Sequence, residues 1–151
     1  MNKKVSSILV GVAGEYFVAA ELSKLGYIAS ITLRNTRGID IIATNEEGSN
    51  TVNIQVKTKS HKNKWVMSEK NELVKDKNIF YVFVSLNDGF SRPDYHISPS
   101  SDVAQFIKND HQKWLDTPGK SGQKHNDTKM RQWYDDKNKY LEKWDLLGLD
   151  N

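Results

Sequence analysis

The spacing of apolar residues predicts a helix at the start of the chain. Between Ile8 and Leu25 the apolar side chains recur at intervals of three and four residues, which predicts an α-helix of about five turns. Ser6 or Ser7 is suited to cap the start of this helix, and Gly26 is suited to follow its end.

Short runs rich in β-branched residues come next and predict strands at 27–33, 39–44 and 51–58. Residues 34–38 and 45–50 separate these runs and have the composition of turns. Because only a short loop joins the second and third runs, we expect these two strands to pair antiparallel.

The middle of the chain predicts further strands and two helices. Residues 67–77 favour a short helix, and the continuous apolar run 79–86 is typical of a central strand covered on both faces. A short strand is expected at 95–97, followed by a helix from a serine cap at 100–101 to about residue 109.

From residue 111 the chain becomes charged, with aromatic residues interspersed. We interpret residues 111–151 as a C-terminal helical extension that packs its aromatic side chains on a core made by residues 1–110. The pattern as a whole predicts a single domain of the α/β class, with a mixed central sheet flanked by helices.

Composition narrows the class of protein. A chain of 151 residues with 37% hydrophobic and 27% charged residues can form one folded domain. The formal net charge of +3 permits contact with nucleic acid, and the absence of cysteine excludes disulfides, thiolate metal ligands and cysteine nucleophiles. Glu15 interrupts the first apolar run, and no run approaches the ~20 apolar residues of a membrane span, so we expect a cytoplasmic protein without a signal peptide or membrane contact.

Three polar residues interrupt predicted strands whose other residues are mostly apolar or β-branched. Gln55 and Lys57 are two residues apart, so they project from the same face of the third strand. Asp40 occupies the neighbouring strand, and the intervening residues are enough to finish that strand, turn and return. We therefore expect the three side chains to converge at one end of the hairpin.

Such a cluster can hold a divalent metal ion. Mg²⁺ takes one or two carboxylates and keeps several waters, which the Asp40 carboxylate, the Gln55 side-chain carbonyl and the Val56 backbone carbonyl would allow. Lys57 would then orient the metal-bound water or stabilise charge on an attacked phosphate. Glu15, on the predicted first helix, would add a second acidic group.

These residues resemble a known motif. The order is Glu15 within GEYFVAAEL, then Gly38-Ile-Asp40, then Gln55-Val-Lys57. It is similar to the PD-(D/E)xK nuclease superfamily and most like its Mrr-type D…QxK variant, over about residues 10–100. The resemblance implies a restriction-endonuclease-like αβββαβ core and Mg²⁺- or Mn²⁺-dependent hydrolysis of DNA, by an endo- or exodeoxyribonuclease. It implies that Asp40, Gln55, Lys57 and Glu15 are catalytic, with Asp40, Gln55 and Val56 at the metal.

The chain differs from the superfamily motif at two positions, which keeps other interpretations open. Ile39 stands where many members of the superfamily have proline, and Gln55 removes one negative charge from the site. The chain would then be a nuclease-like module that binds nucleic acid or a protein partner without cleaving. Asp40 and Lys57 would, in the simplest alternative, form only a cross-strand ion pair.

Basic residues surround the predicted site and are candidates for phosphate contact: Arg34, Arg37, Lys59, Lys62 and Lys64. The alternative is that these basic residues only form a solvated loop and contact no ligand. Nothing in the chain resembles a separate target-recognition domain, so specificity for DNA would come from a homo-oligomer, from a protein partner or from the structure of the substrate. The four histidines have no metal-ligand spacing.

Overall fold

The computed structural model describes residues 5–33, 38–61 and 64–150. It begins with α1 (Ser7–Lys24), which Ser6 caps by accepting a hydrogen bond from the amide of Leu9 at 3.3 Å. Gly26 follows the helix with a φ of 91°, a left-handed conformation that glycine adopts without steric cost. The predicted helix and both of its end signals are confirmed.

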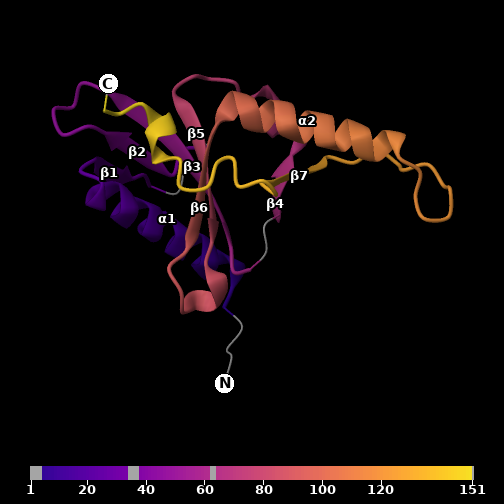
Figure 1. Cartoon of the computed structure of the whole chain (residues 1–151), viewed down its shortest axis with the longest axis horizontal. Helices are drawn as coiled ribbons and strands as arrows, with labels where there is room; N and C mark the ends of the chain where they lie inside the picture. Colours follow the sequence, from indigo (N-terminus) through magenta and orange to yellow (C-terminus); the bar gives the residue numbers. More distant parts are fainter. Residues whose placement is uncertain (1–4, 34–37, 62–63, 151) are drawn as a thin grey trace.

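The strands form a mixed five-stranded sheet in the order β1-β2-β3-β5-β6. Only β3 and β5 run parallel, and the other neighbouring pairs are antiparallel (Figure 1). The bounds are β1 Ile28–Ile31, β2 Ile41–Thr44, β3 Thr51–Lys59, β5 Ile79–Ser85 and β6 Asp94–Pro99. The α/β class, the mixed sheet and the antiparallel pairing of the second and third strands are thus confirmed.

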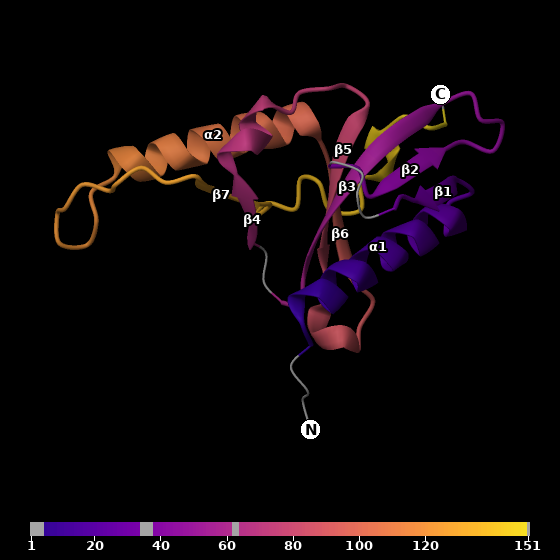
Figure 2. The ribbon, with the colours of Figure 1, turned by 180° about the vertical axis from the view of Figure 1, so that it is seen from behind.

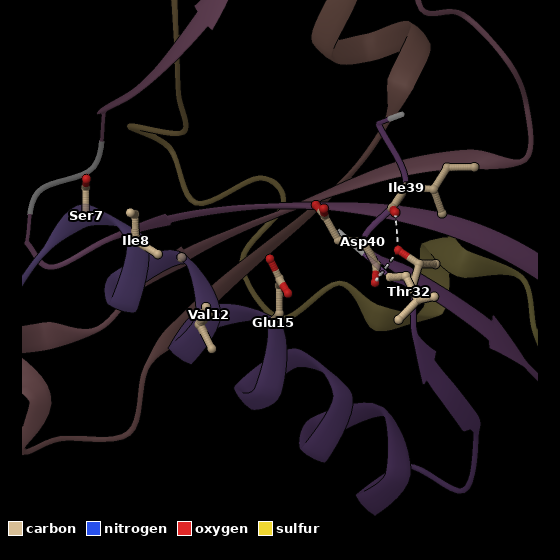
Figure 3. Close-up of a pocket in the computed structure, with 9 residues that line it drawn as sticks. Ser7, Ile8, Val12, Glu15, Thr32, Ile39 and Asp40 are labelled. Carbon is tan, nitrogen blue, oxygen red and sulfur yellow. Dashed lines mark hydrogen bonds between the residues drawn. The ribbon is translucent and has the colours of Figure 1, made fainter. Parts of the chain in front are cut away.

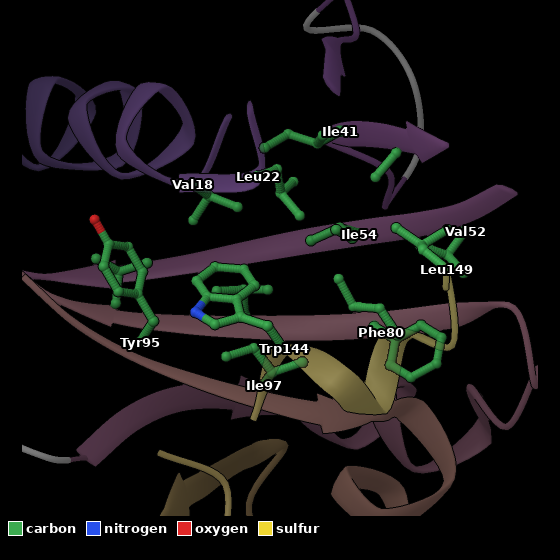
Figure 4. Close-up of a cluster of buried hydrophobic side chains, with 14 residues drawn as sticks. Val18, Leu22, Ile41, Val52, Ile54, Phe80, Tyr95, Ile97, Trp144 and Leu149 are labelled. Carbon is green, nitrogen blue, oxygen red and sulfur yellow. The ribbon is translucent and has the colours of Figure 1, made fainter. Parts of the chain in front are cut away.

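Strand β5 divides the interior into two clusters, because its successive side chains point to opposite faces. On one face, α1 and the C-terminal residues pack over the sheet (Figure 4). We call this group the aliphatic cluster; its members include Val18, Leu22, Ile41, Ile54, Val82, Val84, Ile97, Trp144, Leu147 and Leu149.

The opposite face of β5 carries a second cluster. There α2 (Ser100–Asp116) packs together with a separate two-stranded sheet of β4 (Lys64–Ser68) and β7 (Met130–Tyr134), seen from behind in Figure 2. We call this group the aromatic cluster; its buried members are Trp65, Met67, Tyr81, Phe83, Val103, Ile107 and Trp133. The expectation that β5 is covered on both faces is confirmed.

Three expectations need correction. The segment 67–77 holds the end of β4 and a 3₁₀ helix, η1 (Glu69–Leu73), rather than an α-helix. The helix expected to end near residue 109 continues to Asp116, and it follows Pro99, whose fixed φ suits a helix start, instead of a serine cap.

The C-terminal extension is not helical beyond Asp116. Its described residues form β7 and the short 3₁₀ helix η3 (Trp144–Leu147). The aromatic residues do pack on the core as expected, since Trp133 and Trp144 are both buried. β7 pairs with β4, more than 60 positions earlier in the chain. Its buried residues alternate with more exposed ones because only one face of the strand packs on the core. Among the described residues, no helix combines the length and the apolar character that crossing a membrane requires.

Candidate active site

Asp40 lies where two paired strands separate. The pairing of β2 with β3 reaches only Ile41 and Ile54, whereas β3 continues to Lys59. The amide of Asp40 donates to the carbonyl of Ile54 at 2.8 Å, and Asp40 Oδ2 accepts a hydrogen bond from the amide of Val56 at 2.7 Å. The carboxylate thus replaces the backbone acceptor that β2 no longer supplies.

The same geometry places the Val56 carbonyl at the edge of β3 that β2 no longer covers. In a strand, the N–H and the C=O of one residue project toward the same neighbouring strand. Since the Val56 amide points to Asp40, the Val56 carbonyl also points to the edge that β2 has left. This is where the sequence predicts a neutral oxygen ligand.

Burial shifts the pKa values of Asp40 and Lys57 in opposite directions, and each shift favours the neutral form of the group. Loss of solvent raises the pKa of Asp40, although the Val56 amide and the nearby Lys57 ammonium act to lower it. Loss of solvent lowers the pKa of Lys57, and the Asp40 carboxylate acts against that shift. The two groups attract each other, but this attraction does not offset the effect of burial on either pKa. The surroundings therefore disfavour the charged form of both side chains.

Glu15 and Asp40 line one open pocket of about 280 Å³ between α1 and the sheet. Figure 3 shows the carboxyl group of Glu15 pointing from α1 toward Asp40. The helix reaches this position because Gly14 lies against β3: a Cβ at residue 14 would overlap the side chain of Thr58. A glycine next to Glu15 therefore sets how close its carboxyl group lies to the sheet.

Gln55 and Lys57 lie on the other face of β3. Ile54 belongs to the aliphatic cluster under α1, so alternation directs Gln55 and Lys57 away from α1. Their ladder neighbours are Tyr81 and Phe83 of the aromatic cluster. Asp40 connects the two faces, because it shares the pocket with Glu15 and interacts electrostatically with Lys57.

The position of Gln55 agrees less closely with the prediction. Its side-chain amide lies 4.0 Å from where a Cβ of Gly38 would be, so it is near the turn that precedes Asp40. It does not line the pocket, and among the described residues no hydrogen bond joins it to Asp40. The structure thus brings together Asp40, Val56 and Lys57, with Glu15 across the pocket and Gln55 at its margin.

One residue of the site escaped the sequence analysis. Thr32 donates from its amide to the carbonyl of Asp40 at 2.9 Å and from Oγ1 to the carbonyl of Ile39 at 2.6 Å (Figure 3). It holds the backbone just before β2. The register of the first two strands is the signal that could have found it, since Ile31 pairs with Ile41 and the next step places Thr32 opposite Asp40.

The predicted phosphate-contact residues are only partly described. Arg34, Arg37 and Lys62 lie outside the described residues. Lys59 ends β3, and its carbonyl accepts a hydrogen bond from the amide of Leu86 at 2.9 Å. Lys64 begins β4, and its ammonium lies 4.8 Å from the centre of the Tyr134 ring. Contact with nucleic acid stays a prediction for all five.

The donor set at this site is small. Within residues 5–33, 38–61 and 64–150, no group of three or more His, Cys, Asp or Glu side chains is placed to hold a metal ion. Two carboxylates and neutral backbone and amide oxygens remain. They fit a Mg²⁺ ion, which takes one or two carboxylates and keeps several waters, better than an ion that needs a full protein cage.

Comparison of the chain with protein-family models, with curated proteins and with solved structures returned no match. The residues of the site therefore carry whatever is proposed about function.

Proposed function

We propose that this protein hydrolyses DNA phosphodiester bonds with the help of Mg²⁺ or Mn²⁺ at Asp40. The observation that carries the proposal is the position of Asp40 at the separation of β2 and β3. There its carboxylate is held by the Val56 amide and interacts with the half-buried Lys57. A carboxylate and a backbone carbonyl then lie at one open edge of the sheet, and the Lys57 ammonium interacts with that carboxylate from the other face of β3.

The arrangement of elements supports the resemblance to the PD-(D/E)xK superfamily. The chain runs helix, three antiparallel strands and then a strand parallel to the third. Asp40 lies directly before the second strand, and Gln55 and Lys57 lie in the third. The restriction-endonuclease-like core is part of this proposal. One difference is that β4 and a 3₁₀ helix stand between β3 and β5, where the expected order has an α-helix.

Each residue has a distinct proposed role. Asp40 would hold the ion with the Val56 carbonyl and waters, with Gln55 at the margin and Glu15 across the pocket. The bound ion would supply Lewis-acid polarisation of the phosphate and a lower pKa for its water. Lys57 would donate hydrogen bonds to the attacking water or to phosphate oxygens as negative charge develops, and its desolvation strengthens that interaction.

A second function keeps the same surface without cleavage. The sparse carboxylates and the marginal Gln55 favour a nuclease-like module that binds nucleic acid or a protein partner. Lys59 and Lys64, with Arg34, Arg37 and Lys62, would contact phosphates in either case. DNA as the partner and a cytoplasmic location belong to this proposal too.

Cleavage assays separate the two functions. Purified protein is incubated with supercoiled, linear and branched DNA, with Mg²⁺, Mn²⁺ or EDTA, beside Asp40→Asn and Lys57→Met. The matched controls are Glu47→Gln, an exposed hairpin carboxylate, and Lys70→Met, an exposed lysine. We expect metal-dependent cleavage that falls at least ~100-fold in the two site variants and is unchanged in the controls.

Three outcomes are informative. Equal cleavage by all variants would identify a contaminant and remove the support for catalysis. Absence of cleavage on every substrate, together with DNA binding that ignores the metal, would favour the binding module. Binding of Mn²⁺ that Asp40→Asn abolishes and Glu47→Gln retains would assign the metal site to Asp40 even where the substrate tested is not cut.

A further inference from the structure

The outward face of α1 is apolar, which is unusual for a helix that covers a sheet. The helix buries Val10, Gly14, Val18 and Leu22 against the sheet. At 3.6 residues per turn the opposite side would normally carry charged residues. Instead Leu9, Ala13, Tyr16 and Ala20 stand on it, with exposed fractions of 59% for Leu9 and 65% for Tyr16.

The acidic residues of α1 do not interrupt this face. Glu15 lines the pocket and Glu21 pairs with Arg92, so both lie along the flanks of the helix near the sheet. Lys24 is the only other charged residue within the bounds of α1, and it stands in the last turn. In both views the helix lies on the outside of the sheet, and no described element covers its far side (Figures 1 and 2).

The apolar surface continues from α1 onto the chain before β2. Ile8 and Leu33 line the mouth of the same pocket and are 66% and 86% exposed. We define the α1 surface by its large exposed side chains: Val5, Ile8, Leu9, Tyr16, Phe17 and Leu33. With exposed fractions between 45% and 86%, these six side chains expose on the order of 700 Å², most of it apolar, above the few hundred Å² that a monomer commonly leaves in one patch.

We propose that the α1 surface is the interface of a homodimer. A stable interface buries about 800 Å² on each partner, and the α1 surface supplies most of that area. Its lack of charge is unsuited to phosphates, and an apolar face needs an apolar complement. Of the 16 large apolar side chains that are exposed in the described part of the chain, six belong to the α1 surface, so a second copy offers it an apolar complement across a two-fold axis.

The dimer has a geometric consequence for the pocket. Ile8 and Leu33 belong both to the interface and to the pocket that holds Glu15 and Asp40. The second copy therefore borders the mouth of each pocket, and the two pockets lie on either side of the two-fold axis. The dimer itself does not depend on the proposed nuclease function.

Sedimentation of the full chain tests the association. At micromolar concentrations we expect a species of twice 17.3 kDa. Leu9→Glu and Tyr16→Glu place a charge in the interface, and we expect both to sediment as monomers with circular dichroism and thermal unfolding that remain native. Phe90→Glu and Leu73→Glu, at residues exposed by 93% and 83% outside the α1 surface, are matched controls and should remain dimeric.

A disulfide scan supplies a second measurement. Because the chain has no cysteine, each single-cysteine variant reports one contact. A scan of positions 5, 9, 13, 16 and 20 should give an oxidised dimer at one or two positions, where the two Cα atoms lie about 4.4–6.8 Å apart across the axis. Leu73→Cys is the control for random collision.

Several results would overturn the dimer. One is a wild-type monomer at about 100 μM, a concentration at which even a weak dimer forms. Another is a dimer that Leu9→Glu and Tyr16→Glu both leave intact, or cross-linking no better in the scan than at Leu73→Cys. A wild-type monomer that co-sediments with lipid vesicles would assign the α1 surface to a membrane instead.

Discussion

The aromatic cluster and the candidate active site treat buried polar groups in opposite ways. In the cluster, the indole N–H of Trp65 donates to the carbonyl of Val84 at 3.2 Å. Beside it, His96, whose ring contacts Trp65 and Trp133, pairs with Asp135 at 2.8 Å. Next to the active site, the buried hydroxyl of Thr58 has no partner among the described residues, and burial disfavours the charges of Asp40 and Lys57.

This difference separates polar residues that stabilise the fold from those available for chemistry. A buried polar group with a full set of partners specifies one packing and has little left to offer a ligand. Asp40 has one oxygen held by Val56 and an environment that raises its pKa, so a cation beside it would relieve a cost that folding incurred. Stability should therefore depend on the aromatic cluster, and activity on the open edge of β3.

The largest loss of stability is expected from Trp133→Ala in the aromatic cluster. Trp133 is 1% exposed and stacks on Phe83 with ring centres 3.7 Å apart. Its truncation should lower the free energy of unfolding by about 3–5 kcal/mol, as measured by urea titration. Trp114→Ala, at a residue that is 39% exposed, is the control and should cost far less. If both variants lowered the free energy of unfolding equally, the aromatic cluster would not be the main source of stability.

A somewhat smaller loss is expected from Asp135→Ala, which removes a fully partnered buried carboxylate. Besides His96, Asp135 accepts hydrogen bonds from the amides of Lys139 and Tyr140, both at 2.8 Å. Leaving these groups unsatisfied should cost about 3 kcal/mol, measured by the same titration. Asp136→Ala, at the exposed neighbouring residue, should change the free energy by less than ~0.5 kcal/mol. An unchanged free energy of unfolding in Asp135→Ala would show that the hydrogen bonds of Asp135 contribute little to stability.

Gly14→Ala tests how closely α1 must approach β3. The added methyl group overlaps Thr58, so the helix must shift, and we expect a loss of about 1–3 kcal/mol. Glu15 would move with the helix, so cleavage should fall more than the stability loss explains. Gly11→Ala is the control: its methyl group meets nothing within 4 Å, and it should stabilise α1 by up to ~1 kcal/mol. Similar results for the two would contradict a close approach.

The smallest effect is expected from Asp40→Asn, and it is a gain. Because the pKa of Asp40 is raised in the folded state, its ionisation costs stability as pH rises through that pKa. The neutral amide avoids this cost while its oxygen still accepts from Val56, so the melting temperature at pH 7 should rise by about 2 °C.

The pH dependence sharpens this prediction. Below the ordinary Asp pKa of 3.8 both proteins carry a neutral group at residue 40, and the difference in melting temperature should vanish. Asp145→Asn, at an exposed carboxylate, is the control and should show no such pH-dependent gain. A lower melting temperature for Asp40→Asn at pH 7 would show that the ionised carboxylate stabilises the fold.

Contacts between residues close in the chain could be predicted from the sequence, and contacts between distant residues could not. Asp40 and Val56 lie 16 positions apart within one hairpin, and alternation along two short strands was enough to bring them together. The pairing of β4 with β7 joins Lys64 to Tyr134 across nearly half of the chain. No local pattern in the charged segment 127–144 indicated that partner, so a helix was expected there.

The sequence by itself determined the order of α1 and the five strands of the mixed sheet, the burial of β5 on both faces, and the places of Asp40 directly before β2 and of Gln55 and Lys57 on β3. These follow from side-chain periodicity and turn residues, which act over a few positions. Only the tertiary structure decided that Glu15 faces Asp40, that Thr32 holds the backbone before β2 and that the apolar outer side of α1 stays exposed. Each of these depends on where α1 and β1 dock on the sheet, and docking is set by packing between residues that are distant in the chain.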